Sequence, residues 1–74
     1  MNTNLASYTT ESGTIIQALV EYDEQYNDYV GFVRLTSLNG NQYVPMEADK
    51  SFRSERQAKE FAMRMFARYT GDRK

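Results

Sequence analysis

The chain of 74 residues contains no cysteine, no histidine and no tryptophan, and it has a single proline. Without cysteine it forms neither a disulfide nor a thiolate ligand. Without histidine it lacks the commonest metal ligand and the commonest general base. These absences predict no cofactor and no bound metal. They also argue against an enzyme, because acid–base chemistry would have to come from carboxylates, lysine or tyrosine alone.

Long apolar runs are also absent. No stretch approaches the roughly 18 residues that cross a bilayer, and the first residues do not form a signal-peptide pattern. We therefore expect no membrane partner and a cytoplasmic location, which is typical of chains without disulfides. A chain of this length forms one domain at most and buries only about 60–65% of its unfolded surface. With 41% hydrophobic residues it can still build one thin core.

Charge is divided unevenly along the chain. Residues 1–49 contain one basic and seven acidic residues, a net charge of −6, whereas residues 50–74 contain eight basic and three acidic residues, a net charge of +5. The total of −1 therefore hides two opposite fields. Either the two halves neutralise each other inside the fold, or they form two distinct electrostatic surfaces.

Residue patterning divides the chain into a tail and one domain. Residues 1–13 are polar and predict a flexible tail, which leaves a single domain at 14–74. β-Branched and aromatic residues predict strands at 14–22, 29–38 and 42–48. The polar run 23–28 and the pair Asn39-Gly40 predict hairpin loops. Gly31, inside a strand, indicates a bulge or a close contact with a helix.

A helix at 55–70 is the most strongly indicated element. Ser54 with Gln57 three residues later is a capping-box pattern, and Gly71 predicts a left-handed cap at the other end. Apolar residues follow the helical period at Ala58, Phe61, Ala62, Met65, Phe66 and Tyr69. The predicted fold is α+β: a three-stranded antiparallel meander followed by one C-terminal amphipathic helix packed on one face.

Apolar alternation divides the predicted sheet into two faces. Pairing Leu35 with Val44 gives a helix-facing set of Ile16, Ala18, Val20, Val33, Leu35, Val44 and Met46. The opposite face then carries Ile15, Leu19, Val30, Phe32 and Tyr43. This is more contiguous apolar surface than a monomer leaves in water. The tail could cover it with Leu5 and Tyr8, two copies could pack face to face, or a different protein could bind there.

The leading functional hypothesis is a small non-enzymatic protein-interaction module, with a protein partner or a second copy and no small-molecule substrate. The outer face would supply contact area, and a loop bearing Asp23, Glu24, Tyr26 and Asp28 would supply specificity for a basic partner. This loop lacks calcium-loop spacing and its turn glycine. The size and composition are typical of regulators or inhibitors from phages and mobile elements that bind a host protein.

The alternative hypothesis is a nucleic-acid-binding protein. The run YVGFVRLTSLNGNQY followed by FRSERQAKEF resembles the strands-then-helix layout of plant AP2 domains and of the arm-binding domains of phage-type integrases. Phe52, Ser54, Ala58 and Phe61 match the positions that link strand and helix there. The resemblance implies DNA binding by the sheet, but Arg34 is the one basic residue on these strands, so an acidic sheet would repel phosphate. The alternative site therefore lies on the helix, at Arg56, Lys59, Arg64 and Arg68.

Overall fold

The two central strands are those with the strongest sequence signal. In the computed structural model, which describes residues 2–71, β2 (Ile15–Asp23) pairs antiparallel with β3 (Asp28–Thr36), from Ile15 opposite Thr36 to Asp23 opposite Asp28. The turn between them is polar, and Asn27 adopts a positive φ of 55° there, a conformation that asparagine tolerates better than most residues. The sequence places both strands within two residues of their observed ends.

Residues 2–9 are not a flexible tail, contrary to the prediction. They form β1 (Asn2–Thr9), an edge strand that pairs antiparallel with β2. A turn at residues 10–14 joins the two strands, with Gly13 at a φ of 92° and the Thr14 amide donating to Thr10 Oγ1 at 3.1 Å. The register shifts between Asn4 and Ala6, which is a bulge at Leu5. The domain therefore includes the segment that was expected to lie outside it.

The third predicted strand is divided into three short elements. These are β4 (Gln42–Tyr43), the 3₁₀ turn η1 (Met46–Ala48) and β5 (Asp49–Phe52). Pro45 has no N–H to donate, so the strand stops before it, and the Ala48 amide instead donates to the Pro45 carbonyl at 2.9 Å. Both β4 and β5 pair with β3, which makes a five-stranded sheet in place of the predicted three.

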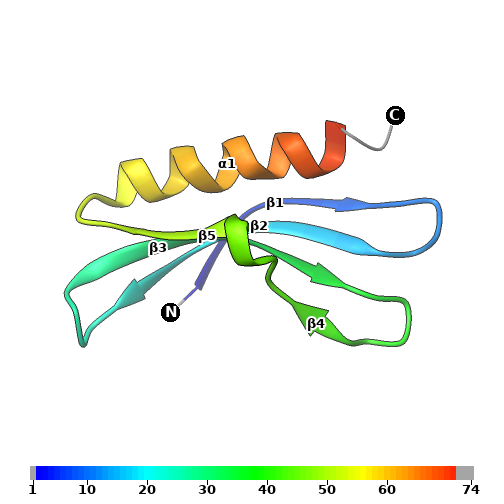
Figure 1. Cartoon of the computed structure of the whole chain (residues 1–74), viewed down its shortest axis with the longest axis horizontal. Coiled ribbons are helices and arrows are strands. Elements are labelled where there is room, and N and C mark those ends of the chain that lie inside the picture. The colour runs from blue at the N-terminus through cyan, green and yellow to red at the C-terminus, as the bar shows by residue number, and fades with distance from the viewer. Residues whose placement is uncertain (1, 72–74) are drawn as a thin grey trace.

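Helix α1 (Glu55–Gly71) lies along one side of the sheet, with its C-terminal end beside the β1–β2 turn (Figure 1). The Gln57 amide donates to Ser54 Oγ at 3.3 Å, which confirms Ser54 as the N-cap. Gly71 is the last residue of the helix, not a left-handed cap beyond it, so that prediction is wrong. No helix within residues 2–71 is long and apolar enough to cross a membrane.

The core lies between α1 and the helix-facing side of the sheet. Ile16 and Val33 are fully buried there, as are two small residues of the helix, Ala58 and Ala62. Close packing is possible because Gly31 has no side chain: a Cβ at this position would overlap the backbone carbonyl of Ala58. Ile16 and Val33 form one cluster with Leu35, Ala48 and Met65, and the half-buried Phe61, Phe66 and Tyr69 pack against it. The predicted α+β fold, with one helix on one face of an antiparallel sheet, is confirmed.

Candidate functional site

The outer face of the sheet carries four of the five apolar residues predicted for it. The β2–β3 register places Leu19 opposite Phe32, with Ile15 and Val30 on the same face. Tyr43 does not belong to this set, because it pairs with Leu35, a helix-facing residue. The predicted pairing of Leu35 with Val44 was displaced by one residue, and such a slip moves every side chain to the other face.

Little of this outer apolar surface is available to a partner. Leu19 is 3% exposed and Phe32 is 8% exposed, so both are buried within a single chain. The register surrounds this pair with polar residues: Asn4 and Asp49 lie in the same row across the sheet. The next row is the Gln17–Arg34 pair, joined by a hydrogen bond of 3.1 Å. The expected wet apolar face is therefore wrong, and Phe32 is ordinary core.

Tyr8 of the first strand does not cover the outer face either. Tyr8 pairs with Ile16, so its side chain lies on the helix side of the sheet. The helix-facing set is confirmed for β2 and β3 only. Val44 and Met46 lie outside the strands, and Met46 is 93% exposed. Their expected place in the core is taken by Ala48, which is fully buried.

The acidic loop forms a tight turn at the end of the β2–β3 hairpin. Asp23 Oδ1 accepts a hydrogen bond from the Gln25 amide at 3.0 Å, and Glu24 is exposed. Tyr26 is 68% exposed, and Asp28 pairs directly with Asp23 across the hairpin. Within residues 2–71, no group of three histidine, cysteine or acidic side chains is arranged to hold a metal ion.

The two edges of the sheet differ in length and charge. β1 offers eight residues, NTNLASYT, none of which is charged. On the opposite side, β5 has four residues, including Asp49 and Lys50, and β4 has two. Charged residues and short strands protect an edge against pairing with another chain. β1 has neither protection, and its one device of this kind is the bulge at Leu5.

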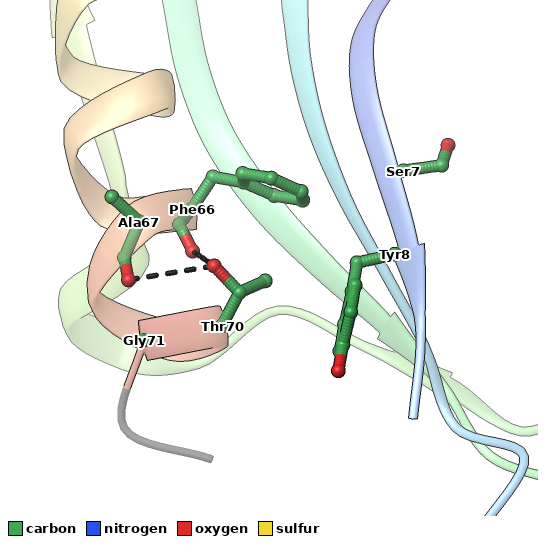
Figure 2. A pocket seen from close by; sticks show the side chains of 6 residues that line it. All are labelled: Ser7, Tyr8, Phe66, Ala67, Thr70 and Gly71. Carbon is green, nitrogen blue, oxygen red and sulfur yellow. Dashed lines mark hydrogen bonds between the residues drawn. The ribbon is translucent and has the colours of Figure 1, made fainter. Parts of the chain in front are cut away.

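A groove adjoins this unprotected edge. It lies between β1 and the last turns of α1 and is formed by Ser7, Tyr8, Phe66, Ala67, Thr70 and Gly71. The rings of Tyr8 and Phe66 project between strand and helix, whereas Ser7 points to the other side of the strand (Figure 2). Thr70 Oγ1 donates to the Phe66 carbonyl at 2.8 Å, which satisfies the hydroxyl within the helix. The groove shares Ser7 and Tyr8 with the edge strand, and no residue of its lining or of β1 is charged.

The predicted basic site divides into paired and unpaired residues. Arg56 contacts Glu60 at 3.3 Å and Lys59 contacts Glu55 at 3.9 Å, each pair one helical turn apart. Within residues 2–71, these are the two salt bridges, so Arg64 and Arg68 remain without one. Instead, the Arg64 guanidinium lies 5.9 Å from the centre of the Phe61 ring.

Sequence reasoning missed Lys50. This residue lies on β5, beside the flank of α1 that carries Arg64. Its ammonium lies 5.6 Å from the Phe52 ring centre, and the Phe52 and Phe61 rings are 5.7 Å apart. The alternation of β5 gives the signal that would have found it, since Lys50 and Phe52 are two residues apart and share a face. We call Lys50, Arg64 and Arg68 the cationic flank.

Tyr69 fixes the C-terminal half of α1 to η1. Its hydroxyl donates to the Glu47 carboxylate. Partial burial and this hydrogen bond raise the pKa of Tyr69 to about 12. The same bond, with the Glu47 backbone and Arg68, lowers the pKa of Glu47. The pair is a structural contact with a measurable titration.

No protein-family model, curated protein or solved structure matches the chain. Function is therefore inferred from the surfaces described above.

Proposed function

We propose that this chain is a non-enzymatic protein-interaction module that self-associates through β1. Two copies would pair their β1 strands antiparallel about a twofold axis perpendicular to the sheet. The observation that carries the proposal is the uncharged edge strand joined to an uncharged groove. An edge strand without charged residues is open to pairing with another chain.

A second copy suits this edge because the interface is self-complementary. The same surface meets itself across a twofold axis, so a charge on β1 would face its own copy, and β1 has none. Beyond the bulge at Leu5, residues 6–9 keep a regular register with β2 and offer an unbroken segment for pairing. Opposed hydroxyl side chains contribute roughly 0.2–1 kcal/mol per cross-strand pair.

The groove would add side-chain contacts to this backbone pairing. Antiparallel pairing about a perpendicular axis keeps both helices on the same side of the combined sheet, so the two grooves would adjoin. Met63, which is 40% exposed, continues the helix stripe of Ala67 and Thr70 that borders the groove. The protein would then act as a dimer.

The test compares two serines on opposite edges of the sheet. Ser7 in β1 and Ser51 in β5 are both exposed and both lie on the outer face. Sedimentation equilibrium of the wild type should give a concentration-dependent mass approaching twice 8.6 kDa. Ser7→Lys should give a monomer with an unchanged circular dichroism spectrum, whereas Ser51→Lys should still dimerise. A monomeric wild type at every concentration, or a dimeric Ser7→Lys variant, contradicts the proposal.

A further inference from the structure

Most acidic residues of the first half of the chain lie on the side of the sheet opposite to the helix. The outer face carries four acidic residues, Glu21, Asp23, Asp28 and Asp49. The basic residues of α1 lie on the helix side. Both salt bridges within residues 2–71 join residues of α1 to each other, so no salt bridge there connects the acidic half to the basic half. The one charge interaction described between the two halves is that of Arg68 with Glu47.

Two cations of the cationic flank are held in place by a pair of aromatic rings. Lys50 lies over Phe52 and Arg64 lies over Phe61, and the two rings contact each other across the junction of β5 and α1. A cation over an exposed ring gains only about 0.5–1 kcal/mol. The contact nevertheless restricts long side chains that would otherwise lose rotamer freedom when they bind a partner.

The third cation, Arg68, lies one helical turn beyond Arg64. Like charges at this spacing destabilise a helix by about 0.2–0.5 kcal/mol. Arg68 helps to lower the pKa of Glu47, but the Glu47 carboxylate accepts a hydrogen bond from the Tyr69 hydroxyl and not from Arg68. Neither arginine forms a salt bridge within residues 2–71, so a bound anion would reduce the repulsion between them.

We propose that Lys50, Arg64 and Arg68 bind the phosphate backbone of nucleic acid without reading its sequence. Cations that follow one flank suit a polymer with regularly spaced charges. Phe52 and Phe61 are half-buried and each has a cation over its ring, so they do not form a free platform for stacking bases. The acidic outer face would be repelled by phosphate and would orient the approach of the helix side.

Fluorescence anisotropy of the full chain with a labelled duplex DNA of random sequence tests this site. The logarithm of the association constant should fall linearly with the logarithm of salt concentration between about 50 and about 200 mM. The expected slope is about −2.7, or about 0.9 for each of three phosphates. Arg64→Gln and Arg68→Gln should each make the slope shallower by about 0.9. Arg56→Gln removes the same charge from an existing pair with Glu60 and is the matched control.

Three results would overturn the inference. The first is no measurable binding at about 50 mM salt. The second is an equal loss of DNA affinity in Arg56→Gln and Arg64→Gln, which would mean that only the net charge of the protein matters. The third is competition by poly-glutamate as strong as by unlabelled DNA, which would assign the flank to an acidic protein. The residues differ from those of the β1 edge, so either proposal can fail alone.

Discussion

The two flanks of α1 belong to one amphipathic helix, but their C-terminal halves differ in charge. The flank beside β1 presents the uncharged Met63, Ala67 and Thr70 in its C-terminal half, whereas its N-terminal half carries Lys59, paired with Glu55. The flank beside β5 and η1 presents Arg64 and Arg68. The buried stripe between them decides how the helix packs, whereas the flanks decide what the packed helix can bind. Two different partners are therefore compatible with one core.

The largest predicted effect comes from the contact between Gly31 of β3 and Ala58 of α1, which holds the helix on the sheet. Gly31→Ala places a methyl group against the backbone carbonyl of Ala58, so the helix must move away from the sheet. We expect a loss of about 3 kcal/mol or more in unfolding free energy, measured by urea denaturation. Gly71→Ala is the control: nothing lies within 4 Å of a Cβ there, and alanine in a helix should be neutral or stabilising. Equal stability of the two variants would show that α1 does not pack on β3 in this way.

Two methionines of α1 differ in burial, one in the core and the other on the flank beside β1. Met65 is 7% exposed and Met63 is 40% exposed, although they are two residues apart on α1. Met65→Ala should cost about 2–3 kcal/mol in the denaturation assay. Met63→Ala should change the unfolding free energy of the monomer by less than about 0.5 kcal/mol, while weakening self-association in sedimentation experiments. If Met63→Ala destabilises the monomer as much as Met65→Ala, the flank is part of the core.

The smallest predicted effect concerns Tyr69 on the flank beside η1. Because its pKa rises from 10.0 to about 12 on folding, the contribution of this hydroxyl to stability is present below pH 10 and is lost as the pH rises towards 12. The Glu47 carboxylate has a lowered pKa, so its contribution is present above its unfolded pKa of 4.5 and is lost as the pH falls through the lower folded value.

Tyrosinate absorbance measures this directly. One of the six tyrosines should ionise near pH 12, and Tyr69→Phe should remove that transition. Tyr26→Phe, at a side chain that is 68% exposed, should leave it in place. A late transition that survives Tyr69→Phe would assign it to a different residue.

The sequence predicts those elements whose own residues carry the signal. β2, β3 and α1 are apolar at the period of their secondary structure, and Ser54 marks the start of the helix through a local hydrogen bond. β1 could not be found in the same way, because an edge strand has few buried residues and NTNLASYT shows no alternation. The available signal was the turn at residues 10–14, where Gly13 adopts a positive φ.

Two further predictions were wrong because hydrophobic alternation determines neither the burial of a sheet face nor the register of a short strand. Alternation assigns Leu19 and Phe32 to the outer face correctly, but it does not reveal that these two side chains are buried there. The register of β4 depended on how the loop 37–41 closes, where the Ser37 amide donates to the Asn41 carbonyl at 2.8 Å. The pairing of Arg56 and Lys59 was predictable from spacing alone, since each has a glutamate one turn away.

The order of the elements determines when the protein can fold during synthesis. Ile16, Val33 and Leu35 are buried by α1, which the ribosome makes only after every strand of the sheet. Until residues 55–71 have emerged, one side of the sheet remains apolar and uncovered. Such an intermediate is the kind of species that aggregates or binds chaperones. The newly made sheet therefore depends on α1 of its own chain to cover this apolar side before another protein binds it.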